Sequence, residues 1–241
     1  REYLLDSSKY GVPQKRKRVI FVGYRKSLLR QNKNVQDVFK NILTAEKPRY
    51  AGYTVTDAVG DLPPLKPGEG NDCWFGEYDG DSITPYQQKM RQCSQAIINY
   101  RARTHMEGDL KRYKFFIEHH KNGNGAATLK DLISERPDLI PDHNNLDEFI
   151  DRFKVQWWHQ PASTIMSHIC KDGHYYIHPD LSQCRSFTVR ESARCQSFPD
   201  NYLFEGPRTE QFRQVGNAVP PMLAKVIATS ILKELNKIYN S

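Results

Sequence analysis

The chain has 241 residues, a formal net charge of +7 and a pI near 9.1, with 38% hydrophobic and 26% charged residues. This length allows one large domain or two small ones, and the charge suits a polyanionic partner, although a basic protein without such a partner has the same balance. The sequence contains no signal peptide and no apolar run near the ~18 residues of a membrane span, so we expect no membrane partner.

The five cysteines argue against a zinc site or a disulfide framework, because they are odd in number and form no Cys-x-x-Cys pair. The eight histidines contain no His-Glu-x-x-His string, and we expect no metal site. The first residue is Arg1 rather than Met. We therefore expect a piece of a longer protein that works in a reducing compartment.

A basic string, YGVPQKRKRVIFVG from Tyr10 to Gly23, stands near the start. Its end, Arg18 to Tyr24, is typical of a short strand buried on both faces, although the basic residues alone also fit a solvated run before an ordinary strand. Few other runs here can partner this strand, so we expect the rest of its sheet elsewhere. Residues 34–43 have helical spacing, and a short helix capped by Thr56 or Asp57 should precede Pro63-Pro64.

Residues 66–84 are rich in Gly, Asp and Glu and predict a flexible loop rather than a nucleotide-binding glycine loop. Residues 85–121 carry two helical stripes, with basic residues and tyrosines interleaved. This mixture suits DNA phosphate contact and stacking, and a solvated helix face is the alternative. The predicted DNA contacts here are Arg101, Arg103, Lys111, Arg112 and Lys114.

Thr128 with Asp131 predicts a capped helix that ends before Pro137, and a last short helix should cover residues 142–153. Residues 155–187 have β character, and the turn at 171–173 predicts a hairpin. Trp157 and Trp158 are either core residues or DNA contacts.

Two further strings follow. The arginine string, TVRESARCQSFPD from Thr188 to Asp200, places Arg190, Glu191 and Arg194 close together on a helix that ends at Pro199-Asp200. The glycine–proline string, QVGNAVPP from Gln214 to Pro221, is a Gly-Asn turn that leads into a closing helix from Pro220 to about Leu235.

In this order, the three strings resemble motifs VIII, IX and X of the DNA (cytosine-5) methyltransferases, and the resemblance covers most of residues 1–62 and 156–232. It implies an α/β fold class: the edge of a Rossmann-like methyltransferase domain plus a mixed α+β target-recognition domain. Residues 1–65 would end the catalytic domain, 66–213 would form the target-recognition domain, and 214–241 would return to the catalytic domain.

The resemblance also implies roles. Arg18 would hold the O2 edge of a flipped cytosine, Arg16 would support the same pocket, and Gln14 would brace the loop beside the DNA. The residues Arg190, Glu191 and Arg194 would organise the recognition domain. One side of the S-adenosyl-L-methionine pocket would be closed by Gly216, Asn217, Ala218 and Val219.

The family's Pro-Cys nucleophile, Glu-Asn-Val acid and Phe-x-Gly-x-Gly cofactor loop are absent from these residues, and Cys195 is expected in the core. We therefore expect the C-terminal half of a restriction–modification enzyme, inactive alone, whose partners are double-stranded DNA and the N-terminal half, in the same polypeptide or as a separate subunit. Its expected location is the bacterial cytoplasm with the nucleoid, or the nucleus of a eukaryote. The alternatives are a catalytically silent DNA-binding or regulatory module and the family's tRNA-methylating branch, which the long residues 66–155 disfavour.

Overall fold

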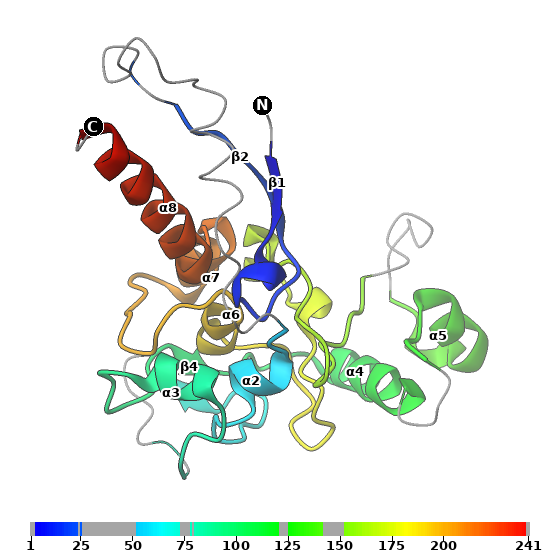
Figure 1. Ribbon diagram of the computed structural model, residues 1–241. Coiled ribbons are helices and arrows are strands. Elements are labelled where there is room, and N and C mark those ends of the chain that lie inside the picture. The colour runs from blue at the N-terminus through cyan, green and yellow to red at the C-terminus, as the bar shows by residue number, and fades with distance from the viewer. Residues whose placement is uncertain are drawn as a thin grey trace.

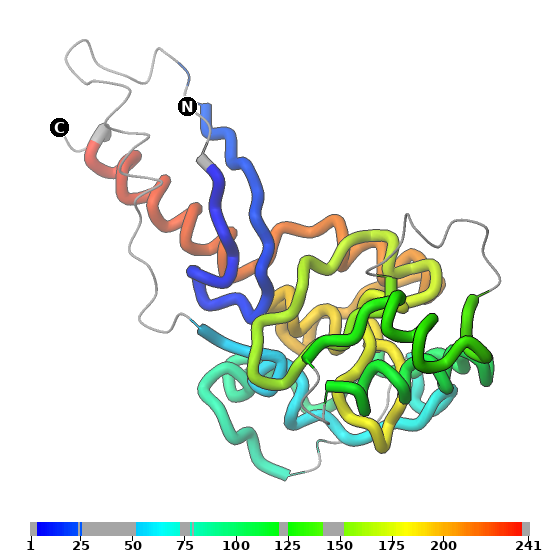
Figure 2. Tube along the Cα trace, turned by 90° about the vertical axis from the view of Figure 1, so that its right-hand side faces the viewer, coloured from blue at the N-terminus to red at the C-terminus, as the bar shows by residue number. Residues whose placement is uncertain are grey.

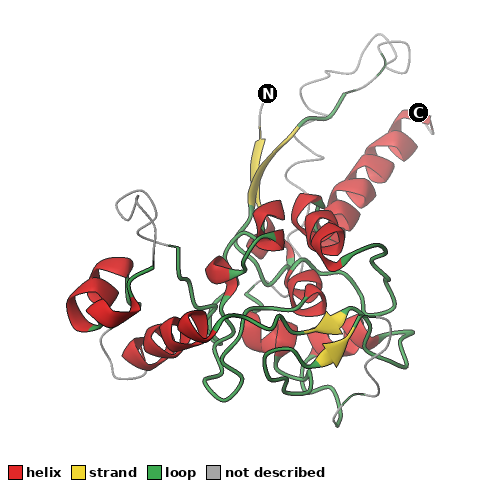
Figure 3. Ribbon diagram, turned by 180° about the vertical axis from the view of Figure 1, so that it is seen from behind, coloured by secondary structure: helices red, strands yellow, loops and turns green. Residues whose placement is uncertain are grey.

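A computed structural model describes residues 3–23, 25, 52–72, 78, 80–120, 125–141 and 152–239. Helices and loops dominate, and the strands form two short antiparallel ladders (Figures 1 and 3). The predicted helix at 34–43 and most of that at 142–153 lie outside the described residues. The elements are β1 (Tyr3–Asp6), η1 (Ser7–Tyr10), β2 (Lys17–Ile20), α2 (Val55–Val59), β3 (Gly70–Asn71), α3 (Pro85–Arg91), β4 (Tyr100–Arg101), α4 (Glu107–His119), α5 (Leu129–Glu135), η4 (Pro137–Leu139), η5 (Ser167–Cys170), η6 (His174–Tyr176), α6 (Val189–Cys195), α7 (Arg208–Asn217) and α8 (Pro221–Tyr239).

The basic string ends in β2, which pairs antiparallel with β1 so that Leu5 faces Arg18 and Leu4 faces Val19. One side of this hairpin packs on α8 through an apolar cluster that includes Leu5 and Ile20. Figure 2 shows the hairpin and α8 rising together from the rest of the molecule. The expectation of burial on both faces is wrong for the described chain, because Leu4 and Val19 remain exposed on the other side.

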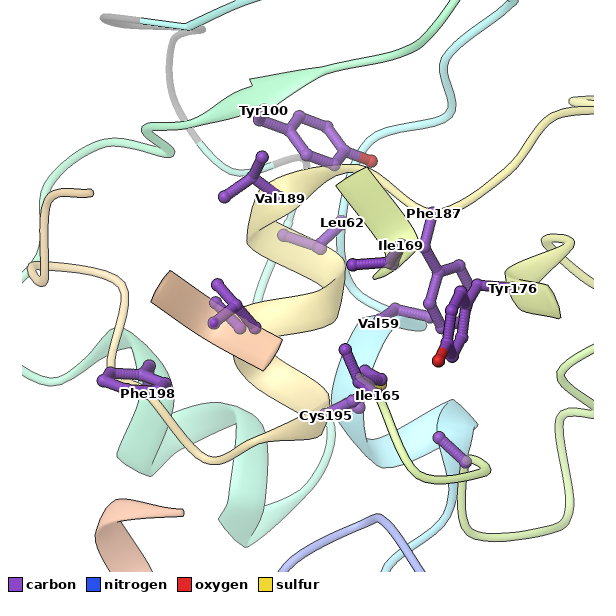
Figure 4. Packing of buried hydrophobic residues seen from close by; sticks show 14 of the residues in the cluster. Val59, Leu62, Tyr100, Ile165, Ile169, Tyr176, Phe187, Val189, Cys195 and Phe198 are labelled. Atoms are coloured by element: carbon purple, nitrogen blue, oxygen red, sulfur yellow. The ribbon is translucent and has the colours of Figure 1, made fainter. Parts of the chain in front are cut away.

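The helix α6 lies at the centre of the main core, and all seven of its residues are buried. It begins where the Thr188 hydroxyl accepts a hydrogen bond from the Glu191 backbone in a capping box, and it ends at Gln196 before the predicted Pro199-Asp200 stop. Apolar side chains from α2, α3, β4 and α7 surround it (Figure 4). The short helix α2 is capped by Thr54, two residues before the earlier of the two expected caps, with Asp57 as the acid of the capping box.

The helices α4 and α5 form a smaller unit with its own apolar cluster, on the far side of the molecule from α3 (Figure 1). The residues Tyr113, Phe116 and Leu132 are buried in it. As the sequence predicts, Thr128 caps α5 and the helix ends before Pro137. The domain boundary at residue 65 stays a prediction, but apolar side chains on both sides of it share the main core.

The predicted hairpin around residues 171–173 is wrong, because 3-10 helices η5 and η6 flank this turn. Gly173 has a φ of 81°, in the left-handed region that favours glycine. Ile177 bridges to Val155 on one side and to Ser186 on the other. The predicted loop at 66–84 likewise contains β3, where Gly70 allows close approach to β4, since a Cβ there would lie 2.1 Å from the Tyr100 carbonyl oxygen.

The predicted Gly-Asn turn is also wrong, because Gly216 and Asn217 form the last turn of α7. By length and composition, the stretch Arg208–Lys237 is the one helical stretch within the described ranges that is long and apolar enough to cross a membrane. A single stretch of this kind is weak evidence, because the core helix of a soluble protein passes the same test. In this structure the stretch is two helices, because α7 ends at Asn217 and α8 begins at Pro221. The second helix, α8, covers one side of the β1–β2 hairpin.

Candidate functional site

Gln14 joins the basic string to the arginine string. Its side chain is fully buried, and its amide nitrogen donates to the Cys195 carbonyl oxygen at 3.3 Å. Its amide oxygen accepts a hydrogen bond from the Ile165 backbone at 3.1 Å. The adjacent Lys15 backbone donates to the Ala162 carbonyl oxygen at 2.8 Å. Gln14 therefore ties this loop to the arginine string, and the role beside the DNA that the resemblance implies for it stays a prediction.

Arg16 joins the same loop to the glycine–proline string. Its guanidinium donates to the carbonyl oxygens of Ile165 at 2.6 Å and Gly216 at 3.0 Å. The residue is 4% exposed, and burial together with the nearby charge of Arg18 lowers the pKa of Arg16 to about 10. The Arg16 guanidinium thus holds together three segments that are far apart in sequence: the loop before β2, the segment around Ile165 and the end of α7.

Arg18 projects from β2 with its guanidinium in solvent, where it donates to the Lys17 carbonyl oxygen at 2.7 Å. Lys17 lies on the opposite face of the strand. Among the described residues, Arg18 makes no ion pair. Its charge is therefore available to a group that approaches the hairpin.

Gly216 packs directly on the backbone of η5. A Cβ at this position would lie 2.3 Å from the Ser167 nitrogen and 2.5 Å from the Met166 carbonyl carbon. The two positions beyond it that carry side chains into solvent are Asn217 and Val219, whereas Ala218 between them is partly buried. The string therefore presents an exposed edge above a tightly packed glycine.

The arginine string is organised by buried ion pairs. Arg194 donates to both carboxylate oxygens of Asp200, at 2.8 and 2.6 Å, and also pairs with Asp61. These two carboxylates raise the pKa of Arg194 despite the opposing effect of burial. The second arginine, Arg190, donates to three carbonyl oxygens, those of Ile98, Pro199 and Tyr202. Both side chains thus join distant segments of the core.

Glu191 makes a bidentate pair with Arg185 at 2.8 and 2.7 Å. Burial alone would raise the pKa of Glu191, but the Arg185 charge and its hydrogen bonds lower it to about 2. The roles of Arg185, Asp61 and Asp200 were missed from the sequence. A buried arginine needs hydrogen-bond acceptors, but Asp61 lies 133 residues from Arg194, and no local spacing indicates that pair.

The five predicted DNA contacts are not brought together on one surface. Two of them serve the protein itself, since Arg103 donates to the carbonyl oxygens that end η5 and Arg112 donates to the Leu139 carbonyl oxygen at 2.7 Å. The other three are exposed and paired with nearby acids: Arg101 with Asp72, Lys111 with Glu107, and Lys114 with Glu118. Their contact with DNA stays a prediction. In the part of the chain that the structure describes, no three His, Cys, Asp or Glu side chains are placed to hold a metal ion.

The model of the C-5 cytosine-specific DNA methylase family matches residues 2–233. The chain is 43% identical over 240 residues to the type II methyltransferase M.Bpa9945I of Bacillus paralicheniformis, a match that covers 98% of this chain and 51% of that protein. It is 32% identical over 241 residues to the type II methyltransferase M.DdeI of Desulfomicrobium norvegicum, covering 95% of this chain and 53% of the relative. The chain therefore spans about half the length of these curated relatives.

A solved structure described as a putative prophage-encoded DNA modification methyltransferase (E. coli) has a similar fold. The TM-score is 0.61 at 22% identity, and the match covers 100% of this chain and 60% of that one. At this identity the likeness concerns the fold alone.

Proposed function

Because the chain belongs to the C-5 cytosine-specific DNA methylase family, we propose that it supplies the C-terminal, target-recognition half of a DNA (cytosine-5)-methyltransferase of the restriction–modification type. The observation that carries the proposal is the joining of the three strings through Gln14 and Arg16, by hydrogen bonds to Cys195, Ile165 and Gly216. This arrangement holds Arg18 and the exposed edge at Asn217–Val219 in fixed positions on one body. The complete enzyme would act on double-stranded DNA in the bacterial cytoplasm.

Within this function, Arg18 holds the O2 edge of the extruded cytosine, because its guanidinium stays charged and presents donors in a rigid fork. Arg16 supports the loop that leads to Arg18, because its two terminal guanidinium nitrogens donate to backbone carbonyl oxygens. Arg190, Glu191 and Arg194, all on α6, would organise the recognition part, and Arg194 ties α6 to the end of α2 through the Ala58 carbonyl oxygen and Asp61.

S-Adenosyl-L-methionine supplies the methyl group when it is bound. The residues of this chain that fit one wall of its pocket are Asn217, Ala218 and Val219, because the side chains of Asn217 and Val219 are exposed while Gly216 anchors them on η5. The other walls belong to the complementary half.

The nucleophile also belongs to that half. None of the five cysteines follows a proline in this sequence. Cys195 is fully buried, and burial raises the pKa of its thiol, which disfavours the reactive thiolate. A catalytically silent DNA-binding module is the second candidate, because the same absence of a Pro-Cys nucleophile also fits a chain that only binds DNA.

The test is methyl transfer from tritiated S-adenosyl-L-methionine to mixed-sequence plasmid DNA. The pure chain should transfer no label. Addition of the part of M.Bpa9945I that this chain does not match should restore transfer, and Cys195→Ala should leave the restored activity intact. Label incorporated by the chain alone, or loss of activity in Cys195→Ala with a normal unfolding curve, would contradict the assignment. DNA binding without transfer in the mixture would favour the silent module.

A further inference from the structure

A cavity of about 350 Å³ opens where the α4–α5 unit meets the loop that carries Lys15. Its walls come from four places: the basic string, the end of α4, residues 126–127 before α5, and the segment 153–163. It therefore lies beside the Gln14 and Arg16 contacts, on the side of the loop that faces the smaller unit.

The rim of this cavity is basic. Lys15 and Lys154 line it, both are exposed, and no lining residue carries a carboxylate. Neither lysine is paired with an acid among the described residues. The groove on the other side of α4 differs, because there Lys111 and Lys114 are balanced by Glu107 and Glu118. A phosphate is thus better accommodated at Lys15 and Lys154 than at the lysines predicted from the sequence.

The floor of the cavity is aromatic. The His120 ring stacks on the Trp157 ring at a centroid distance of 3.7 Å and an interplanar angle of 24°, and Phe116 stacks on Phe153 at 5.2 Å. An aromatic surface of this kind suits a ligand that has a π-face.

We propose that this pocket holds one nucleotide of the bound DNA strand, with its base on the His120–Trp157 stack and its phosphate facing Lys15 and Lys154. Every base has a π-face, so such a platform accepts an unstacked base of any sequence, while the lysines neutralise the backbone. This inference rests on the proposed function, and it adds the residues that hold the strand beside Arg18.

The first experiment measures binding of a fluorescein-labelled oligodeoxythymidine by anisotropy at several salt concentrations. This probe needs no target sequence, because its bases are already unstacked. Lys154→Ala and Lys15→Ala should each weaken binding and lower the slope of log K against log salt by about 0.7, the value for one phosphate contact on a single strand. The control is Lys114→Ala, which removes the same charge from another exposed position. Equal effects from Lys154→Ala and Lys114→Ala would overturn the proposal.

The second experiment locates the base. One thymine of the probe is replaced by 5-iodouracil, which forms photocrosslinks with a stacked aromatic ring, and the crosslinked residue is identified by mass spectrometry. We expect crosslinks at Trp157 or His120. His120→Ala should weaken binding by roughly 5- to 150-fold if the stacking platform is lost with it. Crosslinks found only outside the pocket would rule out the base placement.

These outcomes are separable from those of the methyl-transfer test. If reconstituted methylation succeeds while the pocket variants bind like the control, the function stands and the pocket assignment fails. If Lys15→Ala and Lys154→Ala weaken association with the complementary half but not with the probe, the cavity is a protein interface and the nucleotide assignment is overturned. If the pocket variants behave as expected and methylation fails, the proposed enzyme is wrong and the nucleotide pocket stands.

Discussion

Arg16 and Gly216 lie 200 residues apart in sequence and are joined by a hydrogen bond of 3.0 Å from the guanidinium to the carbonyl oxygen. The same guanidinium binds the Ile165 carbonyl oxygen, and Gly216 in turn lies on the η5 backbone. The loop before β2 and the end of α7 are therefore fixed relative to each other by a buried cation and a glycine. Two predictions concern these residues directly.

Gly216→Ala should destabilise the protein by about 1–3 kcal/mol or more, since the new Cβ would overlap backbone atoms that cannot move independently. Its distance to the Ser167 nitrogen would be 2.3 Å. The matched control is Gly108→Ala in α4, where the nearest atom, on the flexible Arg112 side chain, lies 3.6 Å away. Urea unfolding of both variants checks the prediction, and equal midpoints would contradict it.

Arg16→Ala should lower the free energy of unfolding by roughly 1.5–3 kcal/mol for each of the two charge-assisted hydrogen bonds that it removes. Lys17→Ala, on the exposed side of β2, should change it by less than about 0.5 kcal/mol. Denaturant titration by circular dichroism measures both. If Arg16→Ala unfolds like the wild type, the guanidinium does not join the three strings in solution.

The protein should lose stability between pH 7 and pH 5 because of buried histidines. Burial, assisted by the Arg185 charge, lowers the pKa of His178 to about 3 from its ordinary 6.5, against the opposing effects of Glu191 and Asp180. As the pH falls, His178 is therefore protonated in the unfolded chain before it is protonated in the folded protein. The stability contributed by His178 is therefore complete above pH 6.5 and is lost as the pH falls toward 3, at about 1.4 kcal/mol per unit.

Over the window from pH 7 to pH 5, this amounts to about 2 kcal/mol for one histidine. His105, whose pKa is also lowered to about 3 by burial, contributes in the same window. The stability contributed by Glu191 is lost only below its ordinary pKa of 4.5, which lies outside the window from pH 7 to pH 5. His178→Gln should reduce the pH 7-to-5 difference by about 2 kcal/mol, and His159→Gln, at an exposed position, should not. An unchanged difference in His178→Gln would show that this histidine is not held neutral.

The sequence predicted the elements whose signals are local. The capping box at Thr128 and the clustering of Arg190, Glu191 and Arg194 on one helix need only neighbouring residues, and both are present in the structure. The hairpin around 171–173 was wrong because 3-10 helices flank this turn, and Ile177 bridges in parallel to Val155 and antiparallel to Ser186 instead of pairing across the turn. Long-range pairing of this kind carries no periodic signal.

In the candidate site, too, only features with a local signal in the sequence could be predicted. Basic residue types near α4 indicated a polyanion surface. The i,i+4 spacing of Lys114 and Glu118 is a local signal for their ion pair, but nothing local shows that Arg103 donates to carbonyl oxygens of η5. The stack of His120 on Trp157 joins residues from two distant segments, and only the fold brings Lys15 next to it. Charge composition predicts a polyanionic partner, and tertiary packing decides which cations would be available to it.

Arg18→Ala, tested in the enzyme reconstituted with its complementary half, should reduce turnover far more than DNA affinity. In the proposed function Arg18 meets the cytosine only after the base has left the stack, so its contribution appears late in the reaction. Loss of one charge-assisted hydrogen bond to a buried group is worth roughly 1.5–3 kcal/mol, or about ten- to a hundredfold in rate.

Lys17→Ala is the control, because Lys17 lies on the same strand and points to the opposite face. An arginine that touched only phosphate would weaken binding to all DNA equally and would lower the salt slope by about one unit. Single-turnover rates and equilibrium binding, measured on the same reconstituted samples, separate these cases. Equal losses from the two substitutions would show that the Lys15–Arg18 run is a basic surface without a role in holding the flipped base.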